Sequence, residues 1–184
     1  DDGFQDFSIK KDFSIICFTQ KQWIGNGQLI PSGPLRENLS GLRRANCVII
    51  NGKKDLAIEK KILHENNEIK IFYSKYDPIN INLFNNKKII AFAGIGNPEN
   101  FFDILQANNL NIVKKIKFPD HYKYSEKELK NLIYESKKNN LTLLTTEKDY
   151  FRIDEEYKKN ISFLKISINI EEKEKLIEEI KKII

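Results

Sequence analysis

Short runs of β-branched and aromatic residues alternate along this chain with longer amphipathic stretches, and this alternation limits the possible folds more than any other feature. Such runs form buried strands, whereas apolar residues spaced three or four positions apart form helices that cover a sheet. We expect strands at residues 13–18, 47–51, 69–74, 88–93, 111–118, 141–145 and 162–168. We expect helices at 39–44, 56–65, 98–108, 126–139 and 171–184. The sequence therefore predicts an α/β layered fold.

Two of the helices have well-marked starts. Pro98 suits the first turn of a helix, because its missing N–H would be unpaired there in any case. Ser125 and Glu128 have the spacing of a capping box, in which each side chain bonds the backbone N–H of the other residue. The last helix carries an apolar stripe that must pack on a partner, formed by Leu176, Ile177, Ile180, Ile183 and Ile184.

Composition narrows the class of protein. Hydrophobic residues make up 40% and charged residues 31%, which is typical of a soluble globular chain, and the net charge of +5 gives weak support for an anionic partner. Basic and aromatic residues do not interleave as in RNA-binding modules, so we expect no nucleic-acid partner. Cys17 and Cys47 fall in apolar runs, and we expect both to be buried, reduced thiols. No apolar run is long enough to span a bilayer.

Polar segments follow several of the expected strands. They are residues 94–99, 120–125 and 145–149, and a long Gly- and Pro-punctuated loop occupies 25–37. In open α/β sheets, ligands bind outside the carboxyl ends of the strands. If the strands run parallel, we expect these four segments to line one cleft.

Each of these segments by itself has more than one interpretation. Asp1-Asp2-Gly3 is either a turn or a pair of acids that holds Mg²⁺. His121, next to Asp120, either caps a surface turn or orients a catalytic base. Residues 147–149 are either site residues or a charged helix start. The run 94–99 lacks the third glycine of a dinucleotide fingerprint and has Glu99 there, which disfavours a dehydrogenase.

Taken together and in order, five segments resemble the tetraacyldisaccharide 4′-kinase (lipid A 4′-kinase) family. They are DDGFQ (1–5), GNGQLIPSGPLRE (25–37), AFAGIGNPENFF (91–102), PDHYKYS (119–125) and TTEKD (145–149). The resemblance implies a P-loop kinase that transfers the ATP γ-phosphate to the 4′-hydroxyl of a tetraacyldisaccharide 1-phosphate in lipid A biosynthesis. It also implies a position at the cytoplasmic face of the bacterial inner membrane, held by an N-terminal helix that this segment does not contain.

The resemblance assigns roles residue by residue. Asp1 and Asp2 match the acids that manage Mg²⁺, and His121 with Asp120 matches the motif that assists the catalytic base. Three further residues, Asn26, Arg36 and Glu37, fall in segments that contact ATP in the family. The cofactors implied are therefore ATP and Mg²⁺, and the partners are ATP, the glycolipid substrate and the membrane surface. Asp6 departs from the family, which has a basic residue or His after DDGFQ.

The resemblance also implies a domain plan. Residues 1–12 would end the P-loop kinase domain, 13–165 would form a three-layer α/β/α domain, and 166–184 would return to an N-terminal domain that is missing from this chain. No Walker A pattern occurs in the sequence, and the chain starts without Met. We therefore expect a C-terminal portion that is inactive alone and exposes the apolar stripe of its last helix. The alternative is a non-catalytic α/β module that binds sugar phosphates or nucleotides.

Overall fold

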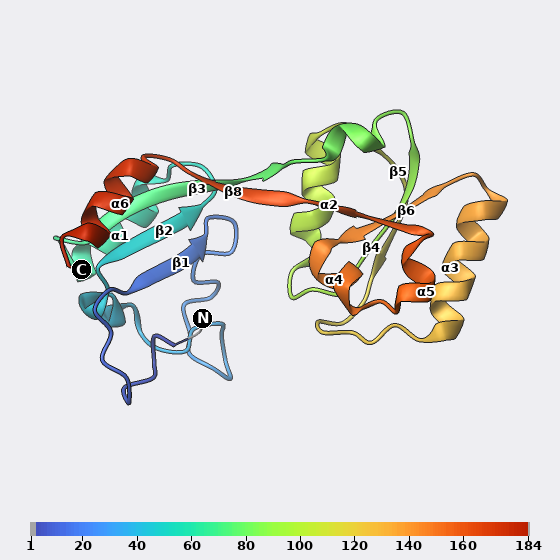
Figure 1. The fold of residues 1–184 in the computed structure, drawn as a ribbon. Coiled ribbons are helices and arrows are strands. Elements are labelled where there is room, and N and C mark those ends of the chain that lie inside the picture. Colours follow the sequence, from blue (N-terminus) through green and yellow to red (C-terminus); the bar gives the residue numbers. More distant parts are fainter. Residues whose placement is uncertain (1–2, 184) are drawn as a thin grey trace. The chain divides into compact units, whose positions relative to one another are not determined.

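The computed structural model describes residues 3–183, and the chain divides into two compact units (Figure 1). The first unit comprises Asp1–Tyr76 and Ile168–Ile184, and the second comprises Asp77–Ser167. Strand β3 (Lys70–Pro78) leads out of the first unit, and β8 (Ile166–Ile170) leads back into it. Among the described residues, none of the helices combines the length and apolar character needed to cross a membrane.

The first unit is built on a four-stranded sheet in the order β1-β2-β3-β8. Strands β1 (Ile15–Thr19), β2 (Cys47–Asn51) and β3 run parallel, and a 3₁₀ helix η1 (Leu39–Arg44) precedes β2. Helix α1 (Leu56–Glu65) links β2 to β3. It begins at the N-cap Asp55, whose carboxylate accepts from the backbone N–H groups of Ala57 and Ile58 and so pairs two donors that the helix leaves free.

Both faces of this sheet are covered by helices. Val48 packs with Ile62 of α1, whereas its neighbour Cys47 packs with Leu176 of α6 (Lys173–Lys181). Because successive strand residues point to opposite faces of a sheet, α1 and α6 cover opposite faces. The β1 strand lies at the edge of the sheet, and Cys17 is exposed there, so the expectation that both thiols are buried is wrong for Cys17 and confirmed for Cys47.

The last helix corrects one expectation from the sequence. The sequence placed the partner of its apolar stripe outside this chain, but Leu176 of that stripe is 5% exposed and packs with Cys47 and Phe72 of the first unit. The sequence suggested a missing partner because a helix stripe shows only that a partner exists, not where along the chain it lies. Ile177 and Ile183 stay partly exposed, at 38% and 45%.

The second unit is a fully parallel sheet in the order β5-β4-β6-β7. Its strands are β4 (Lys88–Ala93), β5 (Asn111–Lys117), β6 (Thr142–Thr146) and β7 (Ile161–Leu164). Its helices are η2 (Ile81–Phe84), α2 (Pro98–Ala107), α3 (Glu126–Lys138), α4 (Glu147–Arg152) and α5 (Glu155–Lys158). Pro98 stands in the first turn of α2, and Ser125 and Glu128 form the expected capping box of α3.

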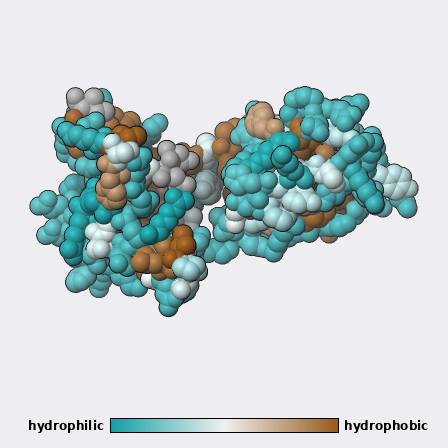
Figure 2. Space-filling view, turned by 90° about the horizontal axis from the view of Figure 1, so that it is seen from below, coloured by the Kyte–Doolittle hydropathy of each residue, from teal (hydrophilic) through white to brown (hydrophobic). Residues whose placement is uncertain are grey.

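Alternation along β4 separates two cores in this unit. Ile89, Ala91 and Ala93 pack against α2, whereas Ile90 and Phe92 pack against α3. The sheet is therefore sandwiched between helices, and the predicted three-layer α/β/α arrangement is confirmed. Figure 2 shows a surface that is mostly hydrophilic, with apolar residues gathered in a few patches.

The strand expected at 162–168 is two strands in the structure. Residues before Lys165 pair with β6 in the second unit, and residues after it join the sheet of the first unit. The boundary between the units also falls inside the range 13–165 that the sequence assigned to a single domain, because β1, β2, β3 and α1 form a sheet layer of their own. Periodicity does not reveal such a boundary, since strands of both sheets have the same apolar pattern.

Candidate functional site

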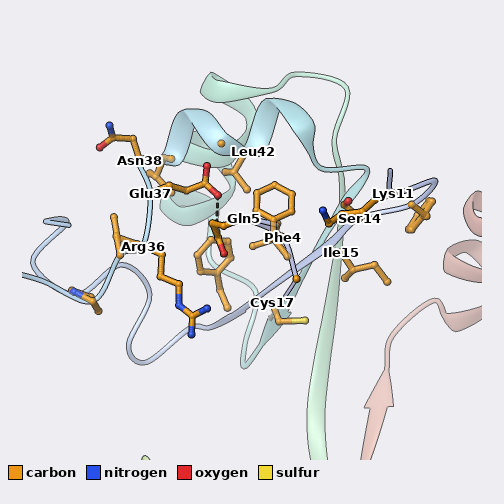
Figure 3. Close-up of a pocket in the computed structure, with 18 residues that line it drawn as sticks. Phe4, Gln5, Lys11, Ser14, Ile15, Cys17, Arg36, Glu37, Asn38 and Leu42 are labelled. Carbon is orange, nitrogen blue, oxygen red and sulfur yellow. Dashed lines mark hydrogen bonds between the residues drawn. The ribbon is translucent and has the colours of Figure 1, made fainter. Parts of the chain in front are cut away.

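The first unit contains a pocket of about 550 Å³ (Figure 3). One wall is the segment Gly3–Gln5, which directly follows the predicted metal ligands, and another is strand β1 with Cys17. Arg36 and Glu37, both predicted to contact ATP, line the same pocket. The fold therefore brings the first two family-like segments together, although they are separated by some 20 residues of loop and strand.

Glu37 is the centre of the polar contacts in this pocket. Its Oε1 accepts a 2.6 Å hydrogen bond from the side-chain amide of Gln5, and its Oε2 accepts a 2.7 Å bond from Arg44 (Figure 3 shows the first). The Arg44 guanidinium also lies 4.7 Å from the centre of the Phe4 ring. Gly41 lets this carboxylate lie close to the backbone, since a Cβ there would stand 2.7 Å from Cδ of Glu37 and would force the Glu37 side chain to move.

The other predicted residues of this unit are not brought to the pocket by the described structure. Asn26 bonds within its own loop: Nδ2 donates to the Ser32 carbonyl at 2.8 Å, and Oδ1 accepts from the Gln28 N–H at 3.1 Å. The predicted metal ligands Asp1 and Asp2 lie outside the described residues. Within residues 3–183, no group of three or more His, Cys, Asp or Glu residues is arranged to hold a metal.

A second polar cluster lies at the carboxyl edge of the sheet in the second unit. From β4 the chain passes to β5 on one side and then, through α3, to β6 on the other side. The point between β4 and β6 is where the strand order reverses, which is the usual ligand position in open α/β sheets. Gly94 directly follows β4, and Asp149 lies in the first turn of α4, which directly follows β6.

Asp149 ties the two strand ends together. Its side chain is 0% exposed, and its Oδ2 accepts from the Gly94 N–H at 3.0 Å and from the Thr146 hydroxyl at 2.8 Å. The Thr146 hydroxyl in turn accepts from the Asp149 N–H and caps α4. Among the described residues, Oδ1 has no hydrogen-bond partner, and it lies 3.6 Å from Nη1 of Arg152.

Arg152 connects this buried carboxylate with the predicted catalytic histidine. Its Nη1 donates to the Gly94 carbonyl at 3.2 Å, and its Nη2 lies 3.0 Å from Nδ1 of His121. His121 has a left-handed backbone, with φ of 57°, and its N–H donates to Oδ1 of Asp120 at 2.9 Å. The second ring nitrogen, Nε2, is 3.9 Å from Oδ2 of Asp120.

Aromatic packing holds the segment that carries His121. Tyr122 stacks on Phe118 at 4.9 Å, and its hydroxyl donates to Glu128 in the first turn of α3. Tyr124 packs edge-on to Phe92, with its hydroxyl over Gly94. Burial, followed by the negative charge of Asp149, raises the pKa of Tyr124, so this phenol stays neutral.

Three of the four segments expected to line one cleft therefore do meet, at residues 94–99, 120–125 and 145–149. The fourth, at 25–37, belongs to the first unit. The charged-helix-start interpretation of 147–149 is also confirmed, because Glu147 and Asp149 stand in the first turn of α4. Sequence reasoning missed Arg152, whose only signal was its position three residues after Asp149 on the same helix face.

Comparisons with known proteins agree with these observations. The family model for LpxK, tetraacyldisaccharide-1-P 4′-kinase, matches residues 1–184. The tetraacyldisaccharide 4′-kinase of Pelagibacter ubique is 42% identical over 179 residues, which are 96% of this chain and 57% of that protein. The enzyme of the same name from Rickettsia akari is 36% identical over 98% of this chain and 54% of its own length.

A solved structure shows the same fold. LpxK from Aquifex aeolicus, crystallised in complex with ATP, matches 99% of this chain with a TM-score of 0.68 at 23% sequence identity. The match covers 56% of that protein, so the chain spans about half the length of the relatives with which it aligns. By the match to its family model along the whole sequence, this chain belongs to the tetraacyldisaccharide-1-P 4′-kinase family.

Proposed function

We propose that this chain is the C-terminal portion of a kinase that phosphorylates the 4′-hydroxyl of a tetraacyldisaccharide 1-phosphate, with ATP as the donor, in lipid A biosynthesis. The observation that carries the proposal is the family match over residues 1–184, together with relatives that bear this enzyme name. The portion alone is inactive in this proposal, because no Walker A pattern occurs within it.

The pocket of the first unit suits the phosphate end of such a reaction. Phosphoryl transfer needs positioning and neutralisation of charge more than covalent chemistry from the protein. Lys11 and Arg36 both line the pocket, and cationic side chains favour a bound phosphate. Asp1 and Asp2 precede the pocket wall, and they would hold Mg²⁺, which neutralises charge on the transferred phosphate. Glu37 fixes this wall through its bonds to Gln5 and Arg44.

His121 has the chemistry required of a residue that assists a base. Its side chain is 71% exposed, so it can reach a sugar hydroxyl or a base supplied by another part of the protein. Its backbone is fixed by Asp120, and the neighbouring tyrosines anchor the segment to α3. In this proposal the complete enzyme works at the cytoplasmic face of the bacterial inner membrane, as the family resemblance implies.

The direct test is an assay of the polypeptide encoded by the whole gene. Purified protein is given ATP labelled at the γ-phosphate and tetraacyldisaccharide 1-phosphate in detergent micelles, and labelled glycolipid is separated by thin-layer chromatography. Label transfer that requires Mg²⁺ supports the proposal. Absence of transfer, together with calorimetric binding of sugar phosphates by the 184-residue chain, would instead identify a non-catalytic binding module.

A further inference from the structure

Arg152 makes three contacts with groups from three different parts of the second unit. Nη1 donates to the Gly94 carbonyl after β4 and lies 3.6 Å from Oδ1 of Asp149 in α4. Nη2 points to Nδ1 of His121, in the loop after β5, at 3.0 Å. A guanidinium has its donors in a rigid planar fork, so fixing one nitrogen also fixes the direction of the other.

The support behind Arg152 is buried and rigid. Asp149 is 0% exposed, and its hydrogen bonds to Gly94 and Thr146 join the ends of β4 and β6. The Arg152 side chain is 24% exposed, whereas that of His121 is 71% exposed. Exposure therefore increases from the buried Asp149 carboxylate, through the Arg152 guanidinium, to the exposed His121 ring. The exposed ring is thus held by groups that the protein interior fixes.

The contact also specifies where the ring carries its proton. Arginine stays protonated and only donates, so the Nδ1 that it approaches must accept. A neutral His121 in this geometry then carries its hydrogen on Nε2. Oδ2 of Asp120 is 3.9 Å from Nε2, which is too long for a hydrogen bond, so this N–H stays available for another acceptor.

We propose that Arg152, held by Asp149, is a positioning residue that fixes the His121 ring with Nδ1 as acceptor and Nε2–H as an outward-facing donor. The catalytic meaning of this arrangement rests on the function proposed above. An Nε2–H donor can orient a carboxylate base, or the sugar hydroxyl oxygen itself, for attack on the γ-phosphate. Neither Asp149 nor Arg152 needs to touch the substrate.

The test uses the fact that the chain has only two histidines, His64 and His121. The 184-residue chain is labelled with ¹⁵N-histidine, and the imidazole nitrogens are observed at about pH 8.5, well above the ordinary pKa of imidazole. His64→Ala assigns the two spin systems. His64 is exposed at the end of α1 and serves as the internal reference for a ring that exchanges between tautomers.

We expect His121 to show one tautomer, with an unprotonated Nδ1 that is shifted by hydrogen bonding, while His64 shows averaged signals. Arg152→Gln should make His121 resemble His64. Arg152→Lys keeps a positive charge near Asp149, and therefore the fold, but one ammonium cannot reproduce the fork, so the His121 signals should average here too. Arg43→Lys, at an exposed ion pair with Glu65 in the first unit, is the matched control and should change nothing.

The proposal is overturned if the imidazole signals of His121 are averaged between tautomers in the unmodified chain. It is also overturned if Arg152→Lys leaves the His121 spectrum unchanged in a folded protein. Kinetic measurements on the whole gene product distinguish a failure of this positioning role from a failure of the proposed kinase function. Arg152→Lys should lower kcat about 10- to 100-fold, as expected for a misplaced catalytic group, with KM for ATP within about twofold. A fixed tautomer in a protein without kinase activity would preserve the positioning role and reject the kinase.

Discussion

The side-chain amide of Gln5 donates a 2.6 Å hydrogen bond to Oε1 of Glu37, which lies 32 positions further along the chain. Arg44 holds the other oxygen of the same carboxylate at 2.7 Å. Both oxygens of Glu37 are therefore engaged by groups of its own unit. This arrangement gives Glu37 the role of fixing the pocket wall around Arg36, in addition to any contact with a ligand.

Replacing Gln5 by Ala should destabilise the first unit by about 1 kcal/mol, because one hydrogen bond to a carboxylate is lost while Arg44 remains. Trp23 is the only tryptophan and packs on Phe18 in this unit, so its fluorescence during urea unfolding reports the change. Gln22→Ala, at an exposed position of the same unit, is the control. Equal midpoints for the two variants would contradict the structural role of Gln5.

Replacing Asp149 by Ala should have a larger effect, a loss of about 2–4 kcal/mol. The change leaves the buried Gly94 N–H without its acceptor and removes the counter-charge of Arg152. Hydrogen exchange measured by mass spectrometry should show faster exchange in peptides that cover β4 and β6. Asp154→Ala, at a helix start without a side-chain cap bond, should leave these peptides unaffected. If hydrogen exchange in these peptides is unchanged in Asp149→Ala, Asp149 does not hold the ends of β4 and β6 together.

The capping box of α3 makes stability depend on pH. Hydrogen bonds from Ser125 and then from Tyr122 hold the pKa of Glu128 below its ordinary value of 4.5. A carboxyl group with a lowered folded-state pKa stabilises the protein above 4.5, and this contribution is lost as the pH falls through the folded-state value. Glu128→Gln keeps the shape but cannot ionise.

We therefore expect the unmodified protein to be more stable than Glu128→Gln at pH 7, by about 0.5–1 kcal/mol as for other helix caps. The gap should close as the pH drops below 4.5. Urea unfolding of both proteins across pH 3–7, followed by far-UV circular dichroism, measures the gap directly, and other carboxylates cancel in the difference. A gap independent of pH would show that the charge of Glu128 contributes nothing to the cap.

The two cysteines should differ sharply in reactivity. Burial raises the pKa of Cys47 to about 11, and the neighbouring Cys17 and Glu179 add to this effect, so little thiolate forms. Partial burial also raises the pKa of Cys17, but this residue is exposed at the sheet edge and lines the pocket, so a reagent can reach its thiol. Ellman's reagent at pH 8 should titrate one thiol in the folded chain and two in urea. Cys17→Ala should abolish the folded-state reaction, and a fast second thiol would disprove the burial of Cys47.

His121→Ala in the whole gene product should lower turnover about 10²- to 10⁴-fold, as expected when a group that assists proton transfer is removed. KM for ATP should change little, because His121 lies outside the residues that line the first-unit pocket. His64→Ala, which removes the other histidine, should leave both constants unchanged. Full turnover in His121→Ala would reject the role proposed for this residue.

The sequence by itself determined the strands and helix starts whose signals lie within a few neighbouring residues. The bounds of β2 and β4 agree with the apolar runs at Cys47–Asn51 and Lys88–Ala93, and the Ser125–Glu128 spacing predicted the start of α3. Helix α5 was missed, and α4 was anticipated only as a possible charged helix start at 147–149, because these helices are 4 and 6 residues long and show too few turns for a periodic pattern.

Tertiary structure decided which of these pieces meet. The contact of Asp149 with Gly94 joins residues 55 positions apart, and that of Arg152 with His121 joins residues 31 apart. Both depend on the order in which parallel strands assemble, which brings the carboxyl ends of β4 and β6 side by side. A sequence read along one strand or helix gives the face on which a side chain lies. Strand order then decides which side chains of other elements it meets, and here it brings α4, with Asp149 and Arg152, beside Gly94 and His121.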